Sequence, residues 1–120
     1  MALTTATTGA DAAWAGLVNA LGAVDGSGIG VAIVDSGIAA HSALAGKVVV
    51  SVDFTRNRGR GVDGYGHGTH IAGIVAGQGI DKARKTGSAG MAPGAHLINL
   101  RVLDDSGAGQ VADVVEALDW

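Results

Sequence analysis

Asp35 and His67 are the two side chains whose types and positions best suit acid–base chemistry. Asp35 directly follows the apolar run 31–34, and a carboxylate at the end of a buried strand costs free energy unless a cation or a hydrogen-bond donor meets it. His67 lies near the first turn of a predicted helix and is a suitable partner. In such a pair the aspartate fixes the imidazole tautomer and stabilises the imidazolium that forms on protonation. The two residues therefore predict general-base chemistry.

Three short strands and three helices must position this pair, and they alternate along the chain. Strands are predicted at 31–34, 47–54 and 95–103, and helices at 10–21, 67–77 and 109–120. This alternation is typical of a parallel sheet with helices on its faces. Ligands gather beyond the carboxyl ends of such strands, where Asp35 lies. We therefore predict an α/β fold, with helices on both faces of a parallel sheet, in one unit that spans residues 1–120.

The apolar residues of the predicted helices indicate which sides face the core. The inward side of helix 10–21 is predicted to carry Trp14, Leu17, Val18 and Leu21. The inward side of helix 109–120 is predicted to carry Val111, Val114, Val115 and Leu118. The helix over 67–77 contains Gly68, Gly73 and Gly77. These glycines predict unusually close packing, because they have no side chain to hold a neighbour away.

The composition describes one globular domain and excludes several classes of function. The chain has 120 residues, 48% of them hydrophobic and 16% charged, so a disordered segment is excluded. Glycine is abundant at 21 residues and aromatic residues make up 3%, which predicts a core of small aliphatic side chains. The net charge of -3 argues against a nucleic-acid partner. The one dense basic cluster, 56–60, is interpreted as a solvated loop.

Neither a membrane partner nor thiol chemistry is indicated. Residues 1–8 have no positive start and no apolar core, so this chain carries no signal peptide. No apolar run is long enough to span a bilayer. The chain has no cysteine, which excludes disulfides and thiolate chemistry.

Five segments, in order along the chain, resemble the subtilisin-like serine proteases, the subtilase or peptidase S8 family. Two of them, Val31-Ala-Ile-Val-Asp35-Ser-Gly-Ile38 and Gly66-His67-Gly-Thr-His70-Ile-Ala-Gly73, are similar to that family's aspartate and histidine motifs. The others are 8–14, 90–95 and 100–109. The resemblance covers nearly the whole chain and implies the N-terminal portion of a subtilisin-like catalytic domain, with a partial three-layer fold.

This resemblance implies a function and a set of site residues. It implies a serine-type endopeptidase in which Asp35 is the orienting acid and His67 the general base. Gly107, Ala108 and Gly109 would offer main-chain groups to an extended polypeptide substrate, which binds by strand addition. A secreted, extracellular location is also implied.

The family's serine segment has no counterpart in this sequence. The six serines are Ser27, Ser36, Ser42, Ser51, Ser88 and Ser106, and none lies in a Gly-Thr-Ser-Met-Ala or Gly-x-Ser-x-Gly context. We therefore expect the nucleophile and the oxyanion hole to come from the remainder of the catalytic domain, and the chain to be inactive alone. A different interpretation is a complete, non-catalytic module that binds extended peptides.

Three other motifs have simpler interpretations. His67-x-x-His70 has the spacing of two metal ligands on a helix, but a zinc site needs further ligands, and we interpret His70 as a packed helix residue. The glycine-rich stretch 26–30 precedes a strand, so it is not a dinucleotide-binding loop. Asp63 is predicted either to shape its loop or to line a substrate pocket.

No cofactor is expected for the chemistry, and a structural calcium ion is not favoured. Ala43 stands where many subtilases place an acidic ligand. The loop 77–90 carries Lys82, Arg84 and Lys85 where a metal-binding loop would lie, and this positive charge is a candidate replacement for the ion. In the family the strand that contains Asp35 is flanked by a later strand, so its free edge predicts self-association.

Overall fold

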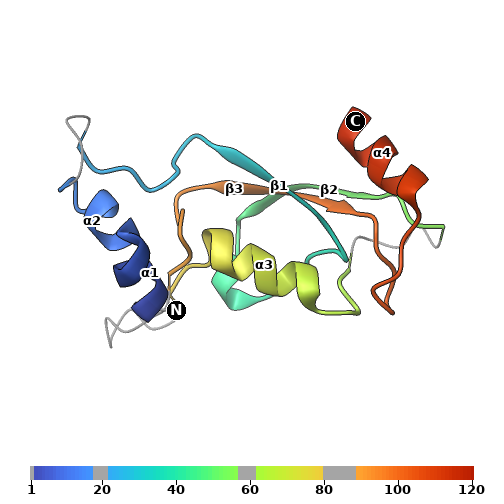
Figure 1. Ribbon diagram of the computed structural model, residues 1–120, viewed down its shortest axis with the longest axis horizontal. Helices are drawn as coiled ribbons and strands as arrows, with labels where there is room; N and C mark the ends of the chain where they lie inside the picture. The colour runs from blue at the N-terminus through green and yellow to red at the C-terminus, as the bar shows by residue number, and fades with distance from the viewer. Residues whose placement is uncertain (1, 18–21, 57–61, 80–88) are drawn as a thin grey trace.

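The computed structural model describes residues 2–17, 22–56, 62–79 and 89–120, and it contains a three-stranded parallel sheet with helices on both faces (Figure 1). The strands are β1 (Gly30–Asp35), β2 (Val48–Asp53) and β3 (His96–Arg101). The helices are α1 (Ala2–Thr8), α2 (Ala10–Trp14), the short 3-10 helix η1 (Ser42–Leu44), α3 (His67–Ala76) and α4 (Val111–Asp119). The predicted α/β fold is confirmed.

The strand order β1-β3-β2 places the last strand of the chain in the centre of the sheet. The register pairs Asp35 of β1 with Arg101 of β3, and Asp53 of β2 with the same arginine. The carboxyl ends of all three strands therefore meet at one edge, and the chain leaves each of them toward the same end of the molecule.

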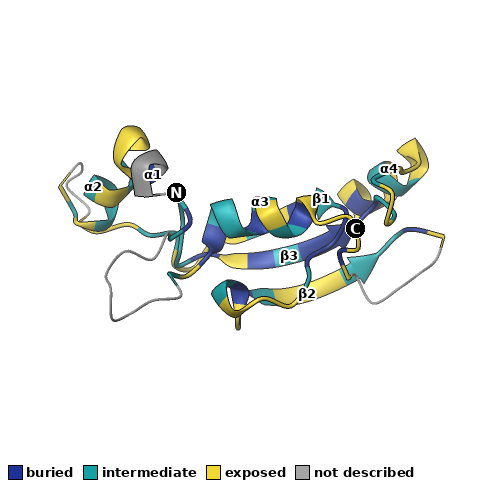
Figure 2. Ribbon diagram, turned by 90° about the horizontal axis from the view of Figure 1, so that it is seen from below, coloured by how far each residue is buried: buried dark blue, intermediate teal, exposed yellow. Residues whose placement is uncertain are grey.

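Alternate residues of β3 serve two separate apolar clusters, one on each face. Leu97 is fully buried with Ile33 and with Ala72 and Ala76 of α3. On the opposite face Leu100 packs with Ala117 of α4. Figure 2 shows the buried residues concentrated along β3, while much of β2 is exposed. Small residues on α3 let this helix approach the sheet closely, as the glycine-rich and alanine-rich composition predicts.

The predicted helix 10–21 is wrong in its extent. In the structure the helix that begins at Ala10, α2, ends at Trp14, and a separate helix, α1, precedes it. Gly16 adopts a positive φ of 72°. Its amide donates to the carbonyl of Ala13, and the amide of Leu17 donates to the carbonyl of Ala12. These two bonds form a Schellman motif, which closes a helix. Leu17 is 78% exposed rather than inward. Residues 18–21, which include the predicted Val18 and Leu21, lie outside the described residues.

The predicted inward face of the last helix is correct at Val114 and wrong at its other three residues. In α4 the buried residue is Ala117, and Val114 is half-buried against the same cluster. Val111, Val115 and Leu118 are exposed, Val111 to 81% and Leu118 to 74%. These residues are exposed because α4 lies beside one end of the sheet (Figure 1). Only a narrow strip of its surface meets β3 and its neighbours.

Close packing of α3 depends on one of its three glycines. A Cβ at Gly68 would collide with the carbonyl oxygen of Gly37, so this position brings the first turn of α3 against the turn that follows β1. A Cβ at Gly73 would meet nothing within 4 Å, and the atoms nearest to a Cβ at Gly77 belong to Gly73 of the same helix. The prediction of close packing is therefore correct at Gly68 alone.

Both outer strands have a single neighbour within the described part of the chain. β1 and β2 each pair with β3, and no described strand lies on their other sides. None of the described helices combines the length and apolar character that a bilayer span needs.

Candidate functional site

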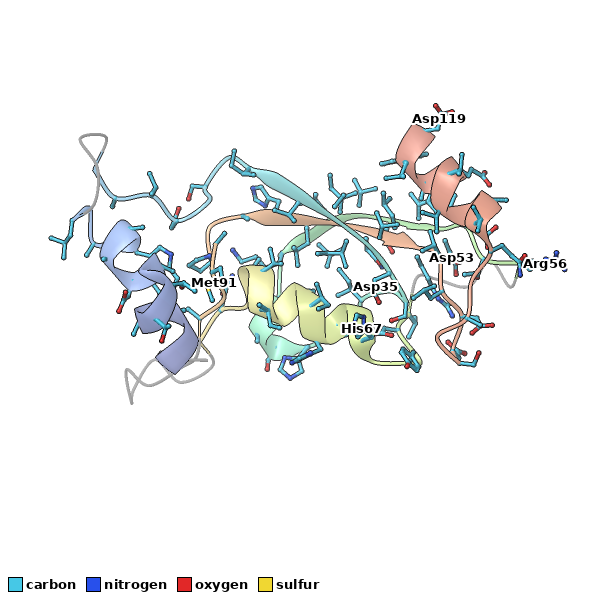
Figure 3. All side chains as sticks on the ribbon, in the orientation of Figure 1. Asp35, Asp53, Arg56, His67, Met91 and Asp119 are labelled. Carbon is cyan, nitrogen blue, oxygen red and sulfur yellow. The ribbon has the colours of Figure 1, made fainter. Side chains whose placement is uncertain are left out.

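The fold brings Asp35 and His67 into direct contact at the carboxyl edge of the sheet (Figure 3). Asp35 is the last residue of β1, and His67 is the first residue of α3. The imidazole Nδ1 lies 2.8 Å from Oδ2 and 2.9 Å from Oδ1 of the carboxylate. An ionised carboxylate has only acceptor oxygens, so Nδ1 must carry the proton that it donates to Asp35. The Nε2 atom of a neutral His67 is then the basic nitrogen.

The two side chains differ in their access to water. The Asp35 side chain is 15% exposed, whereas that of His67 is 54% exposed. The Tyr65 ring lies beside the imidazole, with ring centroids 6.5 Å apart and planes tilted by 41°. A partly buried carboxylate that orients an exposed imidazole leaves Nε2 open to a reacting group. The arrangement is suited to proton abstraction from a hydroxyl that approaches from the solvent side.

A second carboxylate, Asp63, anchors the start of α3. Its Oδ1 accepts hydrogen bonds from the Gly66 amide at 2.7 Å and from the Ser36 hydroxyl at 2.8 Å. Its Oδ2 accepts bonds from the Thr69 amide at 2.8 Å and the Thr69 hydroxyl at 2.5 Å. The sequence left open whether Asp63 shapes its loop or lines a pocket; these contacts and its burial show that it shapes the loop.

The pKa of Asp63 lies below its ordinary value. Burial acts to raise the pKa, but hydrogen bonds from the Thr69 side chain and from the amides of Thr69 and Gly66, with a further bond from Ser36, more than offset that effect. Each of these donors stabilises the charged form. Asp63 therefore stays ionised near neutral pH, at the helix end where the macrodipole favours negative charge.

A buried ion pair ties the ends of β2 and β3 to the following loop. Arg101 Nη1 donates to Oδ2 of Asp53 at 3.1 Å, and Nη2 donates to Oδ1 of Asp105 at 2.7 Å. Its Nε donates to the Leu103 carbonyl at 3.1 Å. The side chains of Arg101 and Asp53 are nearly inaccessible to water. The sequence analysis missed this cluster, although an arginine inside an apolar strand signals a buried acidic partner.

The predicted substrate-contacting residues lie in a tight loop after β3. Leu103 and Gly109 form an isolated antiparallel bridge. Ala108 is bonded within the loop, since its carbonyl accepts from the Asp104 amide at 2.7 Å and its amide donates to Asp104 Oδ1 at 3.1 Å. The amide of Gly107 donates to the Asp104 carbonyl at 3.0 Å. The same carboxylate binds Ser106, and these bonds lower the pKa of Asp104.

This loop is packed against the loop that leads to His67. Gly107 has a φ of 80°, and a Cβ there would collide with the Tyr65 ring. A Cβ at Gly64 would collide with the side chain of Asp105. The amides of Val102 and Leu103 both donate to the Asp35 carbonyl, at 2.8 and 3.2 Å. The loop that contains Gly107 therefore lies against the segment that precedes His67.

The remaining candidates are His70 and the two basic segments. His70 is exposed, so its interpretation as a packed helix residue is wrong; it lines a cavity of about 390 Å³ with His41 and Ile74. Among the described residues there is no group of three or more His, Cys, Asp or Glu side chains that would hold a metal ion. Lys82, Arg84 and Lys85, and residues 57–60 of the basic cluster, lie outside the described residues.

Comparisons with known proteins agree on one family. Residues 26–120 match the profile of the subtilase family, Peptidase_S8. Thermitase from Thermoactinomyces vulgaris is 44% identical over 97 residues, which are 80% of this chain and 34% of that protein. Serine protease AprX from Bacillus subtilis (strain 168) is 39% identical over 95 residues, which are 79% of this chain and 21% of that protein.

A solved structure shows the same similarity in three dimensions. The crystal structure of a cold adapted subtilisin-like serine proteinase superposes on this chain with a TM-score of 0.66 at 31% sequence identity. The match covers 81% of this chain and 33% of the other chain. This chain thus spans about a fifth to a third of the length of the relatives that it matches.

Replacing Asp63 with asparagine should remove a pH-dependent contribution to stability. Because the pKa of Asp63 is lower in the folded state, its contribution is fully present above the ordinary value of 3.8 and is lost as the pH falls below it. We expect Asp63→Asn to lower the free energy of unfolding by about 1–3 kcal/mol at neutral pH. Urea unfolding across the acid range should show the gap to wild type closing below that value. A gap that is independent of pH would contradict this assignment.

Replacing Gly107 with alanine should cost more stability than the same change at Gly46. Both glycines have positive φ, at 80° and 72°, but a Cβ at Gly46 meets nothing within 4 Å. Gly46→Ala should therefore cost only the left-handed backbone penalty of about 1–2 kcal/mol. Gly107→Ala should add about 1–3 kcal/mol from its clash with Tyr65. Denaturant unfolding checks this, and Tyr65→Ala should abolish the excess. Equal costs at the two glycines would disprove contact between the loops.

Proposed function

Because this chain belongs to the subtilase family, we propose that it supplies the acid–base half of a serine-type endopeptidase. Asp35 is the orienting acid and His67 the general base. The nucleophilic serine and the oxyanion hole come from the remainder of the catalytic domain, which is the partner of this chain. The observation that carries the proposal is the contact of Nδ1 of His67 with both carboxylate oxygens of Asp35.

The geometry of this pair suits acyl transfer. Asp35 holds the proton on Nδ1, which makes Nε2 the atom that accepts a proton from a serine hydroxyl. As the imidazolium forms, the nearby carboxylate stabilises its charge at 2.8 Å. The exposed side of His67 gives the incoming hydroxyl access to Nε2. Asp35 and His67 thus supply the acid–base groups for activating the serine, while the serine and the oxyanion hole come from elsewhere.

The substrate is an extended polypeptide that lies along residues 107–109. Strand addition needs main-chain donors and acceptors on an accessible edge. The amide and carbonyl of Ala108 are occupied within the loop. The carbonyl of Gly107 and the main chain of Gly109 are then the groups that would bind a peptide. The close approach of Gly107 to the Tyr65 ring holds this edge beside the segment that leads to His67.

The chain by itself is expected to be inactive. None of its six serines lies in the sequence context of a subtilase nucleophile. Loss of a single oxyanion-hole donor lowers kcat by roughly 10²–10³, and here the nucleophile would be missing as well. No cofactor is required for this chemistry, and calcium is not favoured, because Ala43 has no side-chain oxygen. An extracellular location follows from the same family assignment.

A second candidate function is a non-catalytic module that binds extended peptides. It would use the same loop, closed by the bridge between Leu103 and Gly109, and would need no nucleophile. The two candidates differ in one property, since an activated serine is present in the first and absent from the second.

A fluorophosphonate probe on the natural protein that contains this sequence distinguishes the two functions. We expect the probe to label a species much heavier than 11.7 kDa, because an activated serine reacts with it. In that species Asp35→Asn should lower the labelling rate by about 10⁴-fold. His67→Ala should abolish labelling, and His70→Ala, a change to an exposed histidine of the same helix, should leave it unchanged. An unlabelled product of 11.7 kDa would favour the binding module.

The free edge of β1 is the surface through which we expect the chain to associate. β1 has one described neighbour, and its outer side presents unpaired main-chain groups. The occupant of this edge in the natural protein is the remainder of the domain, and in the isolated chain it is a second copy.

Adding a charge to this edge should weaken the association. Ala32 is an exposed residue of β1, and Ala32→Lys adds the side chain that natural edge strands use against pairing. Sedimentation velocity should show the isolated wild-type chain associating as concentration rises, with the variant shifted about tenfold or more toward monomer, which corresponds to about 1.4 kcal/mol. Ala40→Lys, at an exposed residue outside the strand, is the control. A wild-type chain that remains monomeric at every concentration would refute the proposal.

A further inference from the structure

We propose that Asp63 is a positioning residue for the Asp35–His67 pair, and that its buried carboxylate acts through the Ser36 hydroxyl. The inference rests on the proposed function, since it assigns a role to Asp63 only in aligning the general base. Asp63 and Ser36 are both buried, and neither touches a position where a substrate would bind. They belong to the segments that carry the two functional side chains.

Ser36 connects Asp63 to the carboxylate of Asp35. Its hydroxyl donates to Oδ1 of Asp63 at 2.8 Å, and its amide donates to Oδ1 of Asp35 at 2.7 Å. The Ser36 side chain is fully buried, so water cannot replace either partner without a rearrangement. The amide bond fixes the rotation of the Asp35 carboxylate, and the hydroxyl bond fixes the peptide from which that amide projects.

The same hydroxyl also binds the helix that carries the histidine. Ser36 Oγ accepts a hydrogen bond from the Gly68 amide at 3.0 Å. Asp63 binds the amides on either side, those of Gly66 and Thr69. His67 lies between these anchored amides, so its Cα cannot shift without breaking a bond to Asp63 or Ser36. One buried carboxylate therefore sets the relative position of two segments that are distant in sequence.

Two further contacts close this arrangement. The Thr69 hydroxyl, which donates to Asp63, accepts a bond from the Ala39 amide at 2.9 Å. Gly68 packs on the carbonyl of Gly37 without room for a Cβ. The turn after β1 and the first turn of α3 are thus clamped at three points. Loss of a hydrogen bond at Asp63 would therefore change the distance between Asp35 and His67.

An ionised carboxylate is the group that satisfies this environment. Asp63 faces four donors, two on each oxygen. An asparagine in the same place would offer one acceptor oxygen and would direct its own N–H groups at two of those donors. Asp63→Asn therefore keeps the shape of the side chain while it breaks the bonds on one side.

The test measures the tautomer of His67 directly. The chain is labelled with ¹⁵N-histidine and examined by magic-angle-spinning NMR, which reads the ring nitrogens whether the chain is monomeric or associated. The pH is about 8.5, about two units above the model-peptide value for histidine. The samples are wild type, Asp63→Asn, Ser36→Ala, Asp35→Ala and Asp25→Asn. Asp25 is the matched control, because it binds the amide and hydroxyl of Ser27 in a separate loop.

We expect wild type and Asp25→Asn to show His67 predominantly as the Nδ1–H tautomer. Asp35→Ala should abolish that dominance, because the acceptor is gone. Asp63→Asn should also reduce the Nδ1–H population severalfold, and Ser36→Ala should reduce it less, since Asp63 keeps its bonds to Gly66 and Thr69. The signals of His41 and His96, which lie on other segments, should keep their wild-type shifts in every variant.

Three results would contradict the positioning role of Asp63 or the Asp35–His67 pair itself. If Asp35→Ala changes the tautomer while Asp63→Asn and Ser36→Ala do not, the positioning role is wrong and the Asp35–His67 pair stands. If Asp35→Ala has no effect, the proposed pair itself fails. If Asp63→Asn and Ser36→Ala both shift all four histidines together, Asp63 has a general structural role, and the inference is overturned.

Discussion

The central position of β3 is the constraint on which the rest of the structure depends. Because β1 and β2 both pair with this strand, their last residues, Asp35 and Asp53, fall on either side of Arg101. The same strand supplies both apolar clusters, with Leu97 on one face and Leu100 on the other. A shift of its register by one residue would exchange these faces and separate the strand ends. The packing of β3 therefore places Asp35, Asp53 and Arg101 together at the functional edge.

Three carboxylates near this edge have different environments, and each environment corresponds to a different task. Asp53 meets the buried guanidinium of Arg101, which joins two strand ends. Asp63 meets neutral donors, which hold its pKa low and anchor a helix. Asp35 meets an imidazole, whose ring nitrogens can both accept and donate a proton. Of the three, only Asp35 has a partner suited to transferring a proton, and this selects it for the proposed chemistry.

Close approach at two glycines makes these contacts possible. Gly68 against Gly37 brings the start of α3 to the turn after β1, and Gly107 against Tyr65 brings the loop after β3 to the segment before His67. In both places a side chain on the glycine would separate groups that must meet. The abundance of glycine predicted close packing in general terms, but not these positions. Gly73 lies on the same helix and approaches nothing.

The sequence by itself determined the alternation of strands and helices, the α/β class, and the candidate pair of Asp35 and His67, because hydrophobic periodicity and local motifs are properties of neighbouring residues. Only the tertiary structure decided the side of α4 that is buried and the exposure of His70. It also brought Ser36 to Asp63 and Arg101 to Asp53. These contacts join residues 27 and 48 positions apart. They depend on which strand lies in the centre of the sheet and on where each helix packs, and no local pattern in the chain encodes that choice.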